Sequence, residues 1–278
     1  MTNLYHLLKK SSERELHSYE GALVGALLGF QMGTGTRDFY HSFKGNSVKE
    51  KPQHLLDFSE SIAFDQTVNI NSDDSLMFAL NSVPLGLVHN LDTLDSLTQN
   101  LYDSNSDNPQ AVTGAAAVVA SIIYAKSYHN KSNSNKIIDF LVDYTKSVES
   151  YIANKTGSKD HHISTTIDGF RQSLNGSVSD VLKGLKDSKA LIPIYFYLRN
   201  PFSFDIAMNY AKHYGSDDSD TVTALTGAIA GAQEGIFNFI MQTMKLDPQE
   251  LKKARDLAQK LFLKHANPQF KDVSEVAN

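Results

Sequence analysis

The chain has 278 residues, 41% of them hydrophobic, and a formal net charge of −5. This length and apolar fraction suffice for one large domain or two small ones with a hydrophobic core. The absence of cysteine excludes disulfides, thiolate metal sites, iron–sulfur clusters and a cysteine nucleophile. Because 31 acidic residues outnumber 26 basic ones and no basic run stands out, we expect no nucleic-acid partner. Any cation must then be held by oxygen or histidine ligands.

The hydropathy pattern predicts no membrane span, because no segment approaches the roughly 18–20 apolar residues that a span requires. The first 20 residues are polar and lack the ordered charge, apolar run and cleavage site of a signal peptide. We therefore expect a cytoplasmic protein, or one that is secreted into a host cell without a signal peptide.

Helical periodicity dominates the chain and predicts one all-α domain over residues 1–278. Helices are expected over residues 19–33, 76–90, 92–102, 110–129, 135–153, 203–213, 219–243 and 248–264. The segments 34–71 and 154–179 are rich in Gly, Ser, Asn and Thr and are interpreted as loops. Only Ile192–Leu198 has the pattern of a strand, which Pro193 weakens.

Two of the expected helices carry glycine at every fourth position. The first series is Gly21, Gly25, Gly29 and Gly33, and the second is Gly227, Gly231 and Gly235. Each interior glycine costs a helix about 1 kcal/mol relative to alanine, so the two series indicate a packing demand. We expect these two smooth ridges to pack at the centre of a helical bundle, with each other as one candidate pairing.

Three aspartates precede the second ridge, in the segment Ser216–Thr221. A helix N-terminus explains one or two of them, because Ser or Asp caps free amides and carboxylates suit the positive end of the helix dipole. Three carboxylates within four residues exceed that need, and they repel one another unless a cation lies among them. Asp218, Asp220 and Thr221 offer the hard oxygen ligands that magnesium and calcium prefer.

The stretch DDSDTVTALTGAIAGAQEG (217–235) resembles the C-terminal signature of the ADP-ribosylglycohydrolases, a family that includes the dinitrogenase-reductase-activating glycohydrolase. The first ridge, GALVGALLGFQMG (21–33), is similar to the family's opening motif. Residues 108–117 resemble a third family segment, so the likeness spans residues 21–235 in order. We place the family-like core at about 19–245.

The resemblance implies a single-domain orthogonal helical bundle with two Mg²⁺ ions at its centre. The family's reaction is hydrolysis of the glycosidic bond between ADP-ribose and an arginine or serine side chain, or a related acceptor. The expected partner is therefore an ADP-ribosylated protein, and the expected product is ADP-ribose. In that chemistry metals grip the ribose hydroxyls, a carboxylate activates water, and carboxylates stabilise an oxocarbenium-like transition state.

The family's other metal motif, T-D-D-T-x-M, has two possible counterparts in this sequence. Asn71–Met77 (NSDDSLM) is similar to it with both threonines reduced to serine, which keeps every ligand oxygen. Alternatively, Asp74–Phe78 followed by Val83–Leu87 resembles a later family segment, and the first metal motif has then been lost. In either case Asp73 and Asp74 begin a helix close to the site.

Further positions depart from the family pattern. Phe30 stands where the family has aspartate, and Asn105-Ser106 replaces a Thr-His pair. An eroded metal site is compatible with a pseudoenzyme, a metal-independent hydrolase, or an enzyme whose carboxylates were rebuilt locally. We favour a hydrolase, because the Asp218–Thr221 half is intact.

The sequence therefore predicts an ADP-ribosyl hydrolase, with ADP-ribosylarginine as the first substrate to consider. Asp218 and Asp220, with Thr221, are expected to ligate Mg²⁺ or to act directly as base and ribose clamp. Asp73 and Asp74 are expected to face them as catalytic residues or metal ligands. Asn71, Ser72 and Ser75, together with Thr221, are the candidate substrate-binding residues.

Two other interpretations stay open. The chain could be a non-catalytic ADP-ribose-binding or structural relative of the family. Its Asn/Lys/Ser-rich character also suits a bacterial effector that reverses a partner toxin's modification in a host cell. A further loop, Lys159–His162, is more simply explained as solvated than as a substrate lid or an adenine contact.

Overall fold

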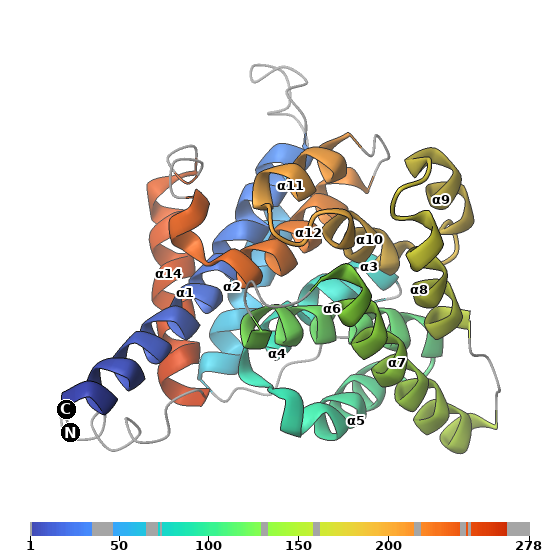
Figure 1. The fold of residues 1–278 in the computed structure, drawn as a ribbon, viewed down its shortest axis with the longest axis horizontal. Coiled ribbons are helices and arrows are strands. Elements are labelled where there is room, and N and C mark those ends of the chain that lie inside the picture. Colours follow the sequence, from blue (N-terminus) through green and yellow to red (C-terminus); the bar gives the residue numbers. More distant parts are fainter. Residues whose placement is uncertain are drawn as a thin grey trace.

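The computed structural model describes residues 2–34, 47–64, 72, 74–128, 133–157, 162–213, 218–239, 243 and 246–265. Side chains are described from residue 12 onward in the first of these ranges and from residue 51 onward in the second. Over these residues the chain forms helices and turns and contains no strand, which confirms the predicted all-α class. Figure 1 shows the arrangement of the helices.

The elements follow one another in a simple order. They are α1 (Thr2–Gly33), α2 (Ser47–Ala63), α3 (Ser75–Asn81), α4 (Val83–Val88), η2 (Leu91–Thr93), α5 (Leu94–Ser104), α6 (Pro109–Tyr128), α7 (Ser134–Thr156), α8 (His162–Ser173), α9 (Val178–Gly184), η3 (Lys189–Leu191), α10 (Ile192–Arg199), α11 (Phe204–Lys212), α12 (Ser219–Glu234), η4 (Ile236–Phe239) and α14 (Pro248–His265).

The pairing of α1 with α12 is the most extensive helix contact, and both glycine series lie in it (Figure 1). A Cβ added to Gly25 or to Gly227 would lie far inside 3.0 Å of the other residue's carbonyl oxygen. Gly21 and Gly231 stand in the same relation to each other. The ridges thus pack backbone on backbone, which confirms the expectation that they pack against each other.

The end of this pairing fixes the start of α12. A Cβ on Gly33 would lie 2.5 Å from the Cα of Asp220, so only glycine allows α1 to pass this close. The hydroxyl of Ser219 donates to the carbonyl of Gly33 over 2.8 Å. The glycine series therefore places the acidic motif against the C-terminal turn of α1.

Four sequence-based assignments are wrong within the described residues. Parts of the two expected loops form α2, α8 and α9, and Ile192–Leu198 belongs to α10 instead of a strand. These helices are short or mostly polar, so their apolar periodicity is weak, and tertiary packing decides their structure. In α10 Pro193 lies in the first turn, where its missing N–H costs nothing.

The last predicted ridge helix is also shorter than expected. It ends at Glu234 and not near residue 243, because Gly235 takes a positive φ of 73° that an α-helix does not allow. Gly235 is therefore a helix terminator, whereas Gly227 and Gly231 are packing residues.

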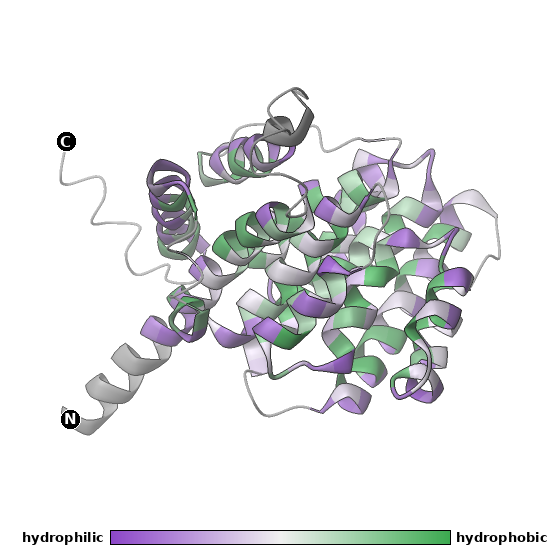
Figure 2. Cartoon of the chain, turned by 90° about the horizontal axis from the view of Figure 1, so that it is seen from above, coloured by the Kyte–Doolittle hydropathy of each residue, from purple (hydrophilic) through white to green (hydrophobic). Residues whose placement is uncertain are grey.

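The hydrophobic core surrounds α6, which is buried over nearly its whole length. By length and composition α6 could cross a membrane, the only described helix that could, although 89% of its most apolar window is buried inside the protein. A core helix passes the same test, and the sequence estimate had overlooked it. Figure 2 shows the apolar helix faces turned toward one another and the polar faces outward.

Helix α2 packs against α14 and α4 through Leu55, Leu56 and Ser59. Its C-terminal end is held by Lys264 of α14, whose ammonium donates to the carbonyls of Ile62 and Ala63 over 3.1 Å each. A cation at the last carbonyls suits the negative end of the helix dipole. These contacts hold α2 beside the N-terminal end of α12. Lys51, near the start of α2, contacts the acidic motif there.

Candidate active site

The acidic motif lies at the N-terminal end of α12. Asp218 is the N-cap residue, but its carboxylate makes no capping hydrogen bond to the helix. Asp220 is buried in the first turn, and its Oδ1 accepts from the N–H of Thr221 over 2.7 Å and from the Thr221 hydroxyl over 3.2 Å. Ser216 and Asp217 lie outside the described residues. The structure thus brings Asp218, Asp220 and Thr221 together, with Asp218 the more exposed carboxylate.

A lysine from α2 lies directly on the buried half of the motif. The Lys51 Nζ is 3.1 Å from Oδ1 and 3.1 Å from Oδ2 of Asp220, and it is also 3.1 Å from Oγ1 of Thr221. All three oxygens lie within hydrogen-bond distance of the ammonium, which therefore bridges the carboxylate and the hydroxyl. With 27% of the Lys51 side chain and 12% of the Asp220 side chain exposed, the pair is largely shielded from water.

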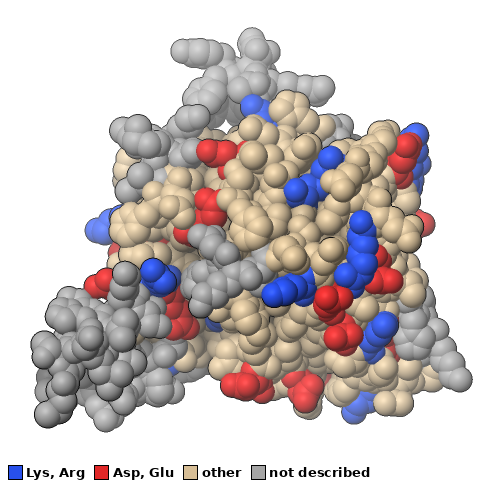
Figure 3. Space-filling model, viewed as in Figure 1, with Lys and Arg blue, Asp and Glu red and all other residues tan. Residues whose placement is uncertain are grey.

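The other aspartate of the motif also has a lysine partner. The Lys189 Nζ of η3 lies 2.6 Å from Oδ2 of Asp218, and both side chains are partly exposed. Figure 3 shows other basic and acidic side chains lying next to one another on one face of the molecule. The two lysines give the motif two positive charges opposite its two described carboxylates.

These contacts decide how well the described residues fit a divalent cation. The oxygens of Asp220 and Thr221 are hard ligands of the type that magnesium takes. The Lys51 ammonium already occupies the position that faces all three of them, and a second cation on the same oxygens would be repelled by it. No cluster of three or more His, Asp or Glu side chains suited to a metal occurs among the described residues. The arrangement therefore does not fit a metal ion at this position.

The second acidic segment begins α3, and its described aspartate serves as a helix cap. Oδ1 of Asp74 accepts from the N–H of Leu76 over 2.8 Å and from the N–H of Met77 over 3.4 Å, and the side chain is exposed. Asn71 and Asp73 lie outside the described residues, so their predicted roles stay predictions. The carbonyl of Ser72 accepts from the amide of Asn105, and the Ser72 hydroxyl accepts from the N–H of Asp74.

A groove runs beside Lys189, the partner of Asp218. Its first cavity, of about 150 Å³, is lined by Ser75 and by Asp187, Ser188 and Ala190, which are neighbours of Lys189 in the chain. The amide of Gln110, at the start of α6, crosses this groove and donates to the carbonyl of Asp187. Of the predicted substrate-binding residues, the structure thus places Ser75 in a cavity next to the Asp218–Lys189 pair.

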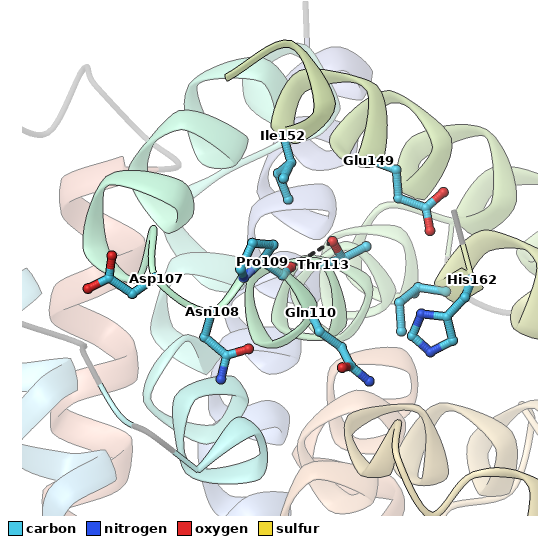
Figure 4. Close-up of a pocket in the computed structure, with 9 residues that line it drawn as sticks. Asp107, Asn108, Pro109, Gln110, Thr113, Glu149, Ile152 and His162 are labelled. Atoms are coloured by element: carbon cyan, nitrogen blue, oxygen red, sulfur yellow. Dashed lines mark hydrogen bonds between the residues drawn. The ribbon is translucent and has the colours of Figure 1, made fainter. Parts of the chain in front are cut away.

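A second cavity of about 260 Å³ continues the groove, because it shares Asn108, Gln110 and Ile163 with the first. Figure 4 shows Gln110 between Asn108 on one side and Glu149 and His162 on the other. The two volumes together fall in the lower part of the range typical of small-molecule sites. Polar groups from α6, α7 and α8 thus face one continuous space.

The far end of this groove is built from a buried carboxylate and a histidine. Glu149 of α7 is buried and accepts from the N–H of Ser164 over 3.0 Å and from its hydroxyl over 2.6 Å. His162 Nε2 lies 2.7 Å from the Ser188 hydroxyl, which links α8 to the loop that carries Lys189. The sequence interpretation discounted His162 as part of a solvated loop, whereas the structure places it in the groove wall.

Sequence reasoning missed the two lysines entirely. Lys51 lies in a segment interpreted as a loop, although Ser47-Val48-Lys49-Glu50 has the spacing of a capping box and Leu55, Leu56 and Ser59 share one helical face. Lys189 has no local signal, because it meets Asp218 only after η3 and α12 have packed. Phe30, which replaces a family aspartate, is buried in the core and fills space there.

Comparison with known proteins identifies the family. A family model described as ADP-ribosylglycohydrolase matches residues 13–269, which is nearly the whole chain. No curated protein matches the chain. The family's ADP-ribosylated substrate and ADP-ribose product agree with the motif and the groove described above. The chain therefore belongs to the ADP-ribosylglycohydrolase family, whose general activity is hydrolysis of an ADP-ribosyl glycosidic bond.

Proposed function

We propose that this protein releases ADP-ribose from a modified arginine side chain of another protein. The observation that carries the proposal is the position of Asp218, a partly exposed carboxylate beside Lys189, whose neighbours in the chain line the groove. A carboxylate near a groove that continues through two cavities suits a substrate whose reacting sugar lies at one end and whose nucleotide extends along the rest.

In the proposed reaction, Asp218 orients a water molecule toward the anomeric carbon of the ribose and accepts its proton. A bond forms between the water oxygen and that carbon, and the bond from the carbon to the arginine nitrogen breaks. Positive charge develops on the ribose ring in the transition state, and the carboxylates of the motif stabilise it. The bonding electrons leave with the guanidine nitrogen, which takes up a proton from solvent, and Asp218 returns the proton of the attacking water to solvent.

Arginine is the preferred linkage for a chemical reason. Free guanidine is a strong base, so it readily takes up a proton as it leaves. A serine linkage would instead release an alkoxide and would need a dedicated acid to protonate it. One carboxylate base is thus enough for the arginine bond, and Asp218, the more exposed of the two described carboxylates of the motif, can supply it.

The magnesium ions that the resemblance implies stay a prediction, and they would need ligands other than Asp220 and Thr221, which Lys51 contacts. We also propose, from the Asn/Lys/Ser-rich character of the sequence alone, that the protein acts as an effector which reverses a modification made by a partner toxin. Detection of a tagged copy in the cytosol of host cells would support that role, and its retention in the producing cell would contradict it.

The hydrolase proposal is tested with proteins that carry ADP-ribose on arginine or on serine, followed by mass spectrometry of the protein and detection of free ADP-ribose. We expect release from arginine to exceed release from serine by more than about tenfold. An Asp218→Ala variant should lose about 10²-fold or more in rate, as expected for loss of a general base. Asp180→Ala, which removes another exposed aspartate paired with a lysine, is the matched control and should keep the parent rate.

ADP-ribose that shifts the melting temperature without turnover of any linkage would contradict the hydrolase proposal. It would favour the non-catalytic binding relative instead.

A further inference from the structure

We infer that Lys51 is a built-in cation, which replaces a metal ion on the oxygens of Asp220 and Thr221. This inference rests on the proposed function only for the role of the site; the cation position itself stands on the contacts of Lys51.

The first support is geometric. The Lys51 ammonium makes three contacts of 3.1 Å, with both carboxylate oxygens of Asp220 and with the Thr221 hydroxyl. These are hydrogen-bond lengths, and they join the ammonium to a carboxylate and a hydroxyl at once. An ordinary surface ion pair is exposed to water, whereas only 27% of the Lys51 side chain and 12% of the Asp220 side chain are exposed. Here the ammonium faces the three oxygens that would be the ligands of a metal ion.

The second support is the origin of the lysine. Lys51 is on α2, some 170 residues before the motif in the chain, and α2 is held in place independently by α14 and α4. The Lys264 contacts fix the opposite end of α2. The ammonium is therefore delivered to the motif by the tertiary fold and not by local helix capping.

The third support is charge. Lys51 and Lys189 contribute two positive charges to Asp220 and Asp218, which equals the charge of one divalent cation. Without them, two neighbouring carboxylates at one helix end would repel each other. The two lysines thus meet the electrostatic demand that otherwise calls for a metal ion.

In this account Lys51 is a positioning residue. It holds Asp220 and the Thr221 hydroxyl in a fixed orientation and leaves Asp218 as the more exposed carboxylate of the motif. The acidic motif at the start of α12 then needs no metal ion on Asp220 and Thr221 to keep its geometry.

The test compares the binding of Mg²⁺ to the full-length parent protein and to Lys51→Ala, by calorimetry and by the melting temperature in MgCl₂ and in EDTA. We expect no response of the parent. We expect the variant, whose Asp220 and Thr221 oxygens are exposed to a cation, to gain saturable Mg²⁺ binding and a rise in melting temperature of about 2–4 °C. Lys51→Arg keeps a cation on the site and should behave as the parent does.

Lys253→Met is the matched control, since Lys253 pairs with Asp57 and Glu60 on the other side of α2 and does not touch the motif. If Lys51→Ala does not fold, Lys51→Gln provides a second comparison, because it removes the positive charge from the site while keeping a polar side chain there.

Equal Mg²⁺ responses of the parent and the variant, including no response in either, would overturn the inference. Release of ADP-ribose is measured in parallel and tests the proposed function separately. A parent that hydrolyses no linkage, while the Mg²⁺ difference is as expected, contradicts the function and supports the cation role.

Discussion

The starts of α12 and α3 carry similar acidic sequences but use them differently. At α3, Asp74 accepts hydrogen bonds from two amides of its own helix, which is ordinary capping. At α12, Asp218 caps nothing, and both aspartates reach lysines that come from distant elements. The comparison indicates that an acidic helix start is a candidate functional site when its carboxylates bind groups from other elements instead of capping their own helix.

The largest expected effect concerns the glycine ridge that places the α12 motif. Gly227→Ala puts a Cβ against the backbone carbonyl of Gly25, which neither helix can avoid without moving apart. We expect a loss of about 3 kcal/mol or more in the free energy of unfolding, measured by urea denaturation. The control is Gly169→Ala on α8, where a Cβ meets nothing within 4 Å and helix propensity predicts a gain of about 0.5–1 kcal/mol.

Equal stabilities of these two variants would show that the α1–α12 contact is not the element that fixes the motif.

A smaller effect is expected for the buried carboxylate at α12. Asp220→Ala takes away two of the three acceptors of Lys51 and one acceptor of the Thr221 N–H. Because the pair is largely buried, we expect a loss of about 2 kcal/mol in chemical denaturation. A loss below about 0.5 kcal/mol is what an exposed ion pair gives and would count against a built site.

The smallest effect is expected at α3. Asp74→Ala removes a helix cap and should cost about 1 kcal/mol, whereas Asp74→Asn should cost only a few tenths because asparagine caps nearly as well. Thermal or urea unfolding of the two variants measures the difference. If asparagine is as damaging as alanine, the charge of Asp74 matters beyond capping and the contrast between α3 and α12 weakens.

The sequence predicted those features of the fold and the site that depend on short local patterns. The glycine spacing predicted a packed pair of ridges, and the motif at residues 218–221 predicted the family and the acidic end of the site. Each signal lies within a short continuous segment, so it can be recognised without the fold.

The rest depends on contacts between distant segments. Helix α2 is polar and contains Pro52, so its periodicity was too weak to predict a helix, and with it Lys51 was missed. The groove needs α6, α7, α8 and η3 together, and Gln110, Glu149 and Ser188 show no shared local pattern. Such a site forms only when distant segments pack together, and a single sequence does not indicate which segments do so.

The contrast between the two acidic helix starts is tested most directly by the rate of ADP-ribose release from an arginine-linked substrate, compared for Asp218→Asn and Asp74→Asn. Both substitutions remove one charge and almost no volume, and asparagine can still cap α3. We predict that Asp218→Asn slows release by about 10²–10⁴-fold and that Asp74→Asn stays within about threefold of the parent. A parent-like rate for Asp218→Asn together with a collapse for Asp74→Asn would contradict the account.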